Sequence, residues 1–582
     1  MKNLNKLKKY FARYKRKLLW GFIFIILSNL GTVYVPLLMK DSIDALQKDA
    51  TNSLLLKYGL MIIAASVFAG IFRFMIRQTI IVVSREIEYD LRGDFWKHIQ
   101  KLPLRYFQNT STGNIMAHAT NDINAVRMFI GPAVMYSTDT FVRLIMVLIL
   151  MFSLNFSLTF YALLPLPLLS ILIYKVGKLI HSKFTIIQDK FAQLTTIAQE
   201  NFSGIRVIKS YVREESEMKR YAAHSKDYLK KNMDLVKTQS LIMPILFMIT
   251  GLSIIIVIWL GGTKVINGDL TLGEITAFIV YLGILIWPMI AFGWVINIIQ
   301  QAEASMKRLN KIFGEPLEIT ESARTNYSVK EISGNIEFRN VSFRYSENSP
   351  FILKNINLEV TAGSTIAILG YTGSGKTSFI NLIPRLYDCT EGEVLIDGIN
   401  IKEIPIDVLR TSIGVVQQES FLFSDTVINN ISYGRRETNT ELAMHVSQIA
   451  QFDKDVQEFP QKYETIVGER GITFSGGQKQ RACLARALAI NPKILILDDS
   501  FSAVDTHTEE EILKNLKSFM KNRTSIIISH RISTVKDADK IIVLSQSKIA
   551  EEGTHEQLIS LGGIYADLHY KQLLEQELEE LK

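Results

Sequence analysis

The glycine-rich loop at residues 370–377, Gly-Tyr-Thr-Gly-Ser-Gly-Lys-Thr, is the pattern in this chain best suited to chemistry. An apolar strand pattern precedes it at 365–369, and a helical pattern begins at Ser378. Free N–H groups and the dipole at a helix N-terminus favour phosphate, and glycine lets the backbone approach it closely. We therefore expect Lys376 to reach the β- and γ-phosphates of a nucleotide and the Thr377 hydroxyl to hold Mg²⁺. A glycine-rich turn without a ligand is the alternative.

Two patterns further along the chain would complete such a site. The segment 474–478, Phe-Ser-Gly-Gly-Gln, is a glycine turn placed directly before a helical pattern. The apolar run 494–497 ends at Asp498, where a magnesium-coordinating carboxylate belongs in a phosphate-loop ATPase. An aspartate that only caps the next turn is the alternative for Asp498.

Length and composition indicate more than one domain and a membrane. A chain of 582 residues is too long to fold around a single hydrophobic core. Its mean hydropathy of +0.17 is above that of ordinary soluble proteins. The net charge is +8, with its densest cationic cluster in residues 2–17. Because an apolar stretch follows at once, retention of this end in the cytoplasm explains the cluster better than nucleic-acid binding. The two cysteines allow neither a disulfide framework nor a metal cluster.

Six segments are long and apolar enough to cross about 30 Å of hydrocarbon. They lie at residues 18–39, 54–74, 129–153, 158–176, 241–260 and 272–298. The connections 77–127 and 178–237 are long and rich in Lys and Arg, so the positive-inside rule places them and both termini in the cytoplasm. We expect them to continue the membrane helices and to turn back near Thr112 and Gly204.

The composition changes after residue 315. Residues 316–334 are mostly polar and are typical of a linker, and alternating strand and helix patterns follow from 335 to 582. The predicted fold is a membrane α-helical bundle of six transmembrane helices with long cytoplasmic extensions (1–315), fused to an α/β P-loop ATPase domain (335–582).

This order of six spans and one P-loop domain resembles a half-transporter of the ATP-binding cassette (ABC) exporter class over essentially the whole chain. The match to the Walker A loop, which binds ATP and Mg²⁺, comprises Gly370, Tyr371, Thr372, Gly373, Ser374, Gly375, Lys376 and Thr377, followed by Ser378. Asp498 ends the match to Walker B, with its magnesium ligand. The match to the signature motif comprises Ser475, Gly476, Gly477 and Gln478, with Phe474 where the family usually has Leu.

The resemblance assigns roles to four further sites. It implies that Tyr345 stacks on adenine, that Gln418 contacts Mg²⁺, and that His530 lies near the γ-phosphate. Asp505 falls in the segment that resembles the D-loop, and residues 467–471 resemble the segment that couples the cassette to the cytoplasmic loops.

In this family two cassettes meet head to tail, and each ATP lies between one Walker A loop and the partner's signature. The resemblance therefore implies a second half-transporter as partner, together with membrane lipid and a hydrophobic small-molecule substrate, and no nucleic acid. Lys376, Gln418, Asp499 and His530 would be the catalytic residues, while Ser475 to Gln478 and Asp505 would contact the partner's ATP.

Asp499 departs from the family pattern, which has glutamate after Walker B to polarise the attacking water. Aspartate is one methylene shorter, and misplacement on this scale can lower rates about a hundredfold. The substitution resembles the weakly hydrolysing subunit of heterodimeric bacterial multidrug or lipid exporters. A homodimer with slow hydrolysis and an ATP-gated regulatory or channel-like subunit are the alternatives.

Ionisable and aromatic residues in the spans suggest a substrate path. Asp139 and Arg143 lie four residues apart deep in the third span, where such groups usually face the bundle interior and mark a pathway. A structural ion pair is the alternative. Trp287, in the sixth span, could contact an amphiphilic substrate or simply pack at a kink. Drug, lipid and peptide cargo all remain open.

Overall fold

The computed structural model of the chain describes residues 3–48, 51–435, 437–468, 471 and 473–580. Two compact units emerge, the first comprising Met1–His98 and Gly113–Gly314, the second Ile99–Thr112 and Glu315–Lys582. The division is not a simple cut of the chain, because a short piece of the first half packs with the second unit.

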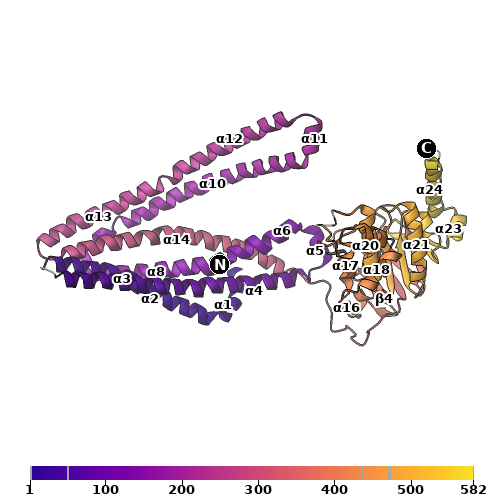
Figure 1. The fold of residues 1–582 in the computed structure, drawn as a ribbon, viewed down its shortest axis with the longest axis horizontal. Coiled ribbons are helices and arrows are strands. Elements are labelled where there is room, and N and C mark those ends of the chain that lie inside the picture. Colours follow the sequence, from indigo (N-terminus) through magenta and orange to yellow (C-terminus); the bar gives the residue numbers. More distant parts are fainter. Residues whose placement is uncertain (1–2, 49–50, 436, 469–470, 472, 581–582) are drawn as a thin grey trace. The chain divides into compact units, whose positions relative to one another are not determined.

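The first unit is entirely helical over its described residues (Figure 1). Three π-helical turns, η2, η3 and η4, join neighbouring helices into longer rods. The elements are η1 (Asn3–Leu7), α1 (Lys8–Arg13), α2 (Lys15–Leu46), α3 (Asn52–Ile76), η2 (Arg77–Ile81), α4 (Val82–Ile99), α6 (Thr112–Ala117), η3 (His118–Asp122), α7 (Ile123–Met128), η4 (Phe129–Ala133), α8 (Val134–Leu154), α9 (Phe156–Leu163), α10 (Leu166–Ser203), α11 (Ile205–Ser210), α12 (Glu214–Gln239), α13 (Ile242–Ile266) and α14 (Leu272–Phe313).

Within the described residues, five continuous helical rods are long and apolar enough to cross a membrane. The predicted span 158–176 is not one continuous helix, because it is divided between α9 and α10 around Leu164 and Pro165. Proline has no N–H to donate and its ring displaces the preceding turn, so an uninterrupted helix is disfavoured there. After this break α10 continues to Ser203, and the chain turns at Gly204, where the sequence predicts the return. Helices α10 and α12 then run side by side (Figure 1).

Three cations near the N-terminus are paired with carboxylates on α4. They are spaced four residues apart, as are the carboxylates, so the two helical segments meet in antiparallel register. The pairs are Lys9–Asp94 (2.9 Å), Arg13–Asp90 (2.6 Å) and Lys17–Glu86 (2.6 Å). Three of the eight cations in the predicted basic cluster therefore hold the N-terminal segment against α4.

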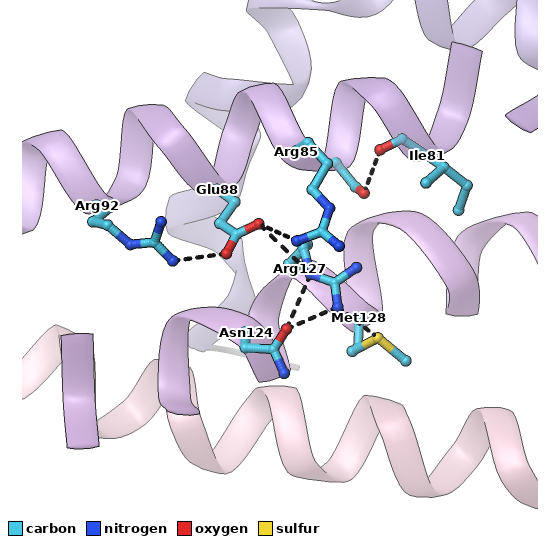
Figure 2. Close-up of polar contacts among 8 residues, drawn as sticks. Ile81, Arg85, Glu88, Arg92, Asn124, Arg127 and Met128 are labelled. Atoms are coloured by element: carbon cyan, nitrogen blue, oxygen red, sulfur yellow. Dashed lines mark hydrogen bonds and ion pairs between the residues drawn. The ribbon is translucent and has the colours of Figure 1, made fainter. Parts of the chain in front are cut away.

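A second charged group, drawn in Figure 2, joins α4 to α7. Glu88 is 9% exposed and accepts hydrogen bonds from Arg85 (3.0 Å) and Arg92 (2.7 Å) on its own helix. Across the interface Arg127 approaches it at 3.7 Å, and the same guanidinium donates to Asn124 at 2.8 Å. A buried carboxylate is tolerated only when it is paired, so these contacts fix α4 against α7.

The second unit is an α/β fold with two sheets. The four-stranded antiparallel sheet has the order β2-β1-β4-β5, and the six-stranded sheet has the order β10-β9-β3-β8-β7-β6, parallel from β9 to β6. The strands are β1 (Ile336–Phe343), β2 (Leu353–Val360), β3 (Thr365–Leu369), β4 (Glu391–Ile396), β5 (Ile399–Asn400), β6 (Ile413–Val416), β7 (Ile494–Asp498), β8 (Thr524–Ile528), β9 (Lys540–Ser545) and β10 (Lys548–Gly553).

The second unit also contains helices, most of which lie between these strands in the chain. They are α5 (Leu104–Asn109), α15 (Lys376–Leu382), α16 (Ile406–Thr411), α17 (Val427–Ile431), η5 (Ser432–Gly434), α18 (Thr440–Ile449), α19 (Asp453–Glu458), η6 (Lys462–Glu464), α20 (Gly476–Ala489), α21 (Thr506–Met520), α22 (Ile532–Val535), α23 (His555–Leu561) and α24 (Ile564–Glu580). Every residue of β7 and of β8 is buried, as parallel strands covered on both faces require.

Helix α5 reaches the second unit from the excursion between α4 and α6. Arg105 donates to the backbone oxygen of Tyr345 (3.1 Å) and forms an ion pair with Glu318. The Tyr387 hydroxyl donates to Gln108 (2.8 Å). The sequence places this segment in the predicted domain 1–315, whereas its contacts join it to the ATPase fold. The predicted domain boundaries otherwise stay a prediction.

Candidate nucleotide site

Strand order decides where the predicted nucleotide residues meet. Strands β3, β8, β7 and β6 are consecutive neighbours and parallel. Their carboxyl ends therefore share one edge of the sheet, which is where ligands bind in open α/β sheets. The segments that follow these strands carry the phosphate loop, His530, Asp498 with Asp499, and Gln418, in that spatial order.

Glycine is structurally required at two positions of the phosphate loop. Gly370 has φ +150°, and a Cβ there would lie 2.4 Å from the backbone oxygen of Leu544. Gly375 has φ +100°, and its Cβ would lie 3.0 Å from the backbone oxygen of Ile352. Side chains at these positions would collide with those backbone oxygens, so glycine lets the loop pack closely against the neighbouring backbone.

Lys376 crosses the inside of this loop. Its Nζ donates to the backbone oxygens of Gly370 (2.8 Å) and Tyr371 (3.1 Å), and the side chain is buried. Burial lowers the pKa of Lys376, while the carboxylates of Asp498 and Asp499 oppose that shift. An anion that enters the loop would stabilise the positive charge of this buried ammonium group.

Thr377 and Asp498 bring two oxygen ligands together. The Thr377 hydroxyl donates to Asp498 Oδ2 at 3.0 Å. Burial raises the pKa of Asp498, the charge of Asp499 adds to this rise, and the Thr377 hydrogen bond together with Lys376 and His530 opposes it. Within the described residues, the buried Ser374 hydroxyl has no hydrogen-bond partner. Hydroxyl and carboxylate oxygens are the donors that Mg²⁺ prefers, so this set fits a nucleotide phosphate with its magnesium ion.

Asp499 stands beside Gln418. Gln418 Nε2 lies 3.5 Å from Asp499 Oδ2, at the outer limit of a hydrogen bond. The Asp499 backbone N–H donates to the oxygen of Ile528 on the neighbouring strand (2.9 Å), and its φ is +44°. Aspartate tolerates this left-handed conformation better than most residues. The carboxylate thus faces Gln418 from a fixed and unusual backbone position.

Tyr345 lies next to the helix that follows the phosphate loop. Its hydroxyl and that of Ser378 are hydrogen-bonded at 2.8 Å, and its ring packs edge-on against Phe343 (5.0 Å) and Tyr387 (5.4 Å). The ring is half-buried. Its stacking on adenine stays a prediction, as do the individual roles of the other site residues.

The signature residues form a second group around the start of α20. Ser475 and Gln478 cap this helix reciprocally, with bonds of 3.2 and 3.0 Å. A Cβ at Gly477 would lie 2.9 Å from the Ala503 oxygen, so glycine permits close approach to the predicted D-loop. Asp505 in turn caps α21 by accepting from the Thr508 N–H (2.9 Å).

Phe474, which replaces the usual leucine, is buried with its ring centroid 5.0 Å from that of Phe459 and 6.1 Å from that of Phe452. This aromatic cluster accommodates the larger side chain behind the signature. In the predicted coupling segment 467–471, Val467 is buried, whereas Glu469 and Arg470 lie outside the described residues.

Asp139 and Arg143 form a closed ring of hydrogen bonds with Asn29, which the sequence analysis missed. Asn29 donates to Asp139 Oδ1, Arg143 donates to Asp139 Oδ2, and Arg143 Nε donates to Asn29 Oδ1, each at 2.8 Å. A buried amide within an apolar span was the available signal. This geometry favours the ion-pair alternative, while substrate contact stays a prediction. Trp287 is 50% exposed.

Known sequences match the chain in both units. The ABC transporter transmembrane region matches residues 18–289, and the ABC transporter domain matches residues 353–502. The multidrug resistance-like ATP-binding protein MdlA of Buchnera aphidicola (subsp. Schizaphis graminum) is 35% identical over 582 residues, which is 100% of both chains. The chain belongs to the ABC exporter family of half-transporters.

Further relatives agree. The probable multidrug resistance ABC transporter ATP-binding/permease protein YheI of Bacillus subtilis is 36% identical over 98% of both chains. The ATP-dependent lipid A-core flippase of Syntrophus aciditrophicus is 33% identical over 96% of this chain and 93% of the flippase. A bacterial Atm1-family ABC exporter solved with ATP bound superposes with a TM-score of 0.79 at 27% identity, covering 96% and 99% of the two chains. This half-transporter is therefore a multi-pass membrane protein whose ATP-binding ATPase domain is coupled to transport.

Proposed function

We propose that this half-transporter exports a hydrophobic or amphiphilic compound, drug-like or lipid-like, outward across the cytoplasmic membrane. It works as one half of a heterodimer and carries the weakly hydrolytic ATP site. The observation that carries the proposal is Asp499, which stands where the family has glutamate in a site whose other parts are present. The names of the relatives, which refer to multidrug resistance and to lipid A-core, support the class of substrate.

Different residues of the nucleotide site bind the phosphates and the magnesium ion. Lys376 and the loop N–H groups hold the phosphates, and Thr377 with Asp498 and Gln418 would hold Mg²⁺. When bound, the ion neutralises charge on the phosphates. Asp499 orients water from a position one methylene too far back, so hydrolysis at this chain's own site is slow.

Two exposed surfaces support a partner chain. Ser475 and Gly476 of the signature are exposed, as is required if they contact an ATP held elsewhere. The tip of the hairpin between α10 and α12 also presents several large apolar side chains to solvent, which is typical of an interaction surface. They are Phe202 (78% exposed), Ile205 (45%), Val207 (61%), Tyr211 (74%) and Val212 (82%).

ATP turnover of the purified chain alone tests the heterodimer. We expect slow turnover, because the partner's signature is missing and Asp499 is short. Vigorous hydrolysis that Asp499→Asn abolishes would instead support a homodimer. Inverted membrane vesicles containing the co-expressed halves then test transport. Accumulation of a fluorescent amphiphile with ATP but not with a non-hydrolysable analogue supports a pump, while equal movement with both nucleotides supports an ATP-gated subunit.

A further inference from the structure

The C-terminal helix α24 is anchored at its start by buried polar contacts. Tyr565 is 0% exposed, and its hydroxyl is hydrogen-bonded to His555 Nδ1 at 2.6 Å. Its backbone N–H donates to Glu551 Oε2 at 2.9 Å. A Cβ at Gly563 would lie 2.1 Å from Glu551 Oε1, so a larger residue there would displace the carboxylate that accepts from the Tyr565 N–H. The first turn of α24 is therefore held firmly against β10 and α23.

Gln572 lies seven residues after Tyr565, on the same face of α24. Its side-chain amide makes two hydrogen bonds to the loop after β8. Gln572 Nε2 donates to the backbone oxygen of His530, and Gln572 Oε1 accepts from the Ile532 N–H at 2.8 Å. One amide thus brackets Arg531 by binding the backbone on both sides of it.

A second element, α21, contacts the same segment. Glu509 on α21 is 3% exposed, forms an ion pair with Arg531, and accepts from the Thr534 hydroxyl at 2.6 Å. The imidazole of His530, by contrast, is exposed. These contacts fix the backbone from which the His530 imidazole projects.

Helix α24 also reaches the phosphate loop. The Tyr371 hydroxyl lies 3.5 Å from Asp567 Oδ2, at the limit of a hydrogen bond, and Lys571 pairs with the same carboxylate at 2.7 Å. The two contacts, at Tyr371 and at His530, place one helix against both segments that would surround the terminal phosphate.

We propose that Gln572 is a positioning residue of the nucleotide site: it holds the backbone of His530 so that the imidazole meets the γ-phosphate, and thereby makes α24 part of the distinction between ATP and ADP. The proposal rests on the proposed function, because it takes His530 to face the γ-phosphate. Gln572 itself does not touch the nucleotide, so its effect passes entirely through His530.

Nucleotide titrations of the full-length protein, purified with its co-expressed partner, test the proposal. Binding of fluorescent mant-ATP and mant-ADP with Mg²⁺ is measured for the wild type, Gln572→Ala and Gln572→Glu. Glutamate keeps the acceptor for the Ile532 N–H but loses the donor to His530. Both variants lose the hydrogen bond to the His530 oxygen, and alanine also loses the one from the Ile532 N–H. Loss of the shared bond predicts about three- to tenfold weaker ATP binding, with ADP binding unchanged, for both variants. Tyr570→Ala is the matched control, since Tyr570 lies on α24 and is 62% exposed.

A double-mutant cycle with His530→Ala separates positioning from general stability. If Gln572 acts through His530, Gln572→Glu adds no further loss of ATP affinity in the His530→Ala background. Additive losses overturn the proposal, as do equal losses for ATP and ADP accompanied by a lower unfolding temperature, or wild-type affinities in both Gln572 variants. A wild-type protein that does not prefer ATP over ADP would refute the role taken for His530 and overturn this proposal, whereas the turnover and vesicle measurements above test the proposed function separately.

Discussion

Replacement of Asp499 by glutamate tests the reason given for a slow site. Gln418 Nε2 is 3.5 Å from Asp499 Oδ2, so the carboxylate stops at the edge of hydrogen-bonding distance. Glutamate adds one methylene, which extends the reach of the carboxylate by up to ~1.5 Å. That is enough to bring it into an ordinary hydrogen bond with Gln418 and toward the water that it must orient.

The expected increase in the hydrolysis rate follows from this added reach of the carboxylate. Misplacement of a catalytic group by about 1 Å can cost about a hundredfold in rate, which corresponds to ~2.7 kcal/mol of activation free energy. Asp499→Glu should therefore raise hydrolysis at this chain's site by up to about a hundredfold. The backbone opposes the change slightly, because φ at Asp499 is +44° and glutamate loses about 1 kcal/mol in the left-handed region relative to aspartate.

Phosphate release from the complex, with the Walker A lysine of the partner half replaced so that only this site turns over, measures the gain. Thermal unfolding of the same samples measures the predicted loss of stability. Asp499→Asn is the control, since it keeps the length and removes the charge, and it should fall to or below the wild-type rate. A stable Asp499→Glu protein with the wild-type rate would show that side-chain length does not limit this site.

Three further changes address other parts of the chain. Gly370→Ala forces a Cβ to within 2.4 Å of the Leu544 oxygen, so mant-ATP affinity should fall at least about tenfold; unchanged affinity would mean that the loop can shift freely. Arg105→Ala removes the contacts of α5 to Glu318 and to the Tyr345 backbone. Because α5 lies in the chain between the membrane-unit helices α4 and α6, we expect it to link ATP hydrolysis to transport, so vesicle transport should fall more than ATP hydrolysis; an equal fall in both would contradict this role. Asn29→Leu leaves two partners of the buried ring unsatisfied, which should lower the free energy of unfolding by about 1–3 kcal/mol; an unchanged thermal midpoint in detergent would show that the ring adds nothing.

The parts of the site that follow buried strands were predictable from the sequence. The apolar runs of β3 and β7 stand out because parallel strands are buried on both faces, and their ends carry the glycine loop and Asp498. The family assignment and the fold class are confirmed by the relatives and by the solved exporter.

Contacts between residues far apart in the chain could not be predicted, because they leave no local pattern in the sequence. Asn29 meets Asp139 across 110 positions, and Arg105 meets Tyr345 across 240. Neither spacing produces a local periodicity, so only the folded chain reveals the pair. The interruption of the fourth span, by contrast, had a local signal in the sequence, namely Pro165. The sequence alone does not say whether a proline kinks a helix or divides it.

Residues Ile99–Thr112 pack with the ATPase fold, which affects how this domain can be excised or exchanged. An ATPase excised at the polar linker would lose the docked segment and would present to water a surface shaped to receive it, with the Tyr387 hydroxyl deprived of Gln108. Hybrids that exchange halves between related exporters should therefore transfer this stretch together with the cassette. In evolutionary terms, substitutions at Gln108 and at Tyr387 are expected to be correlated, although 279 positions separate the two residues.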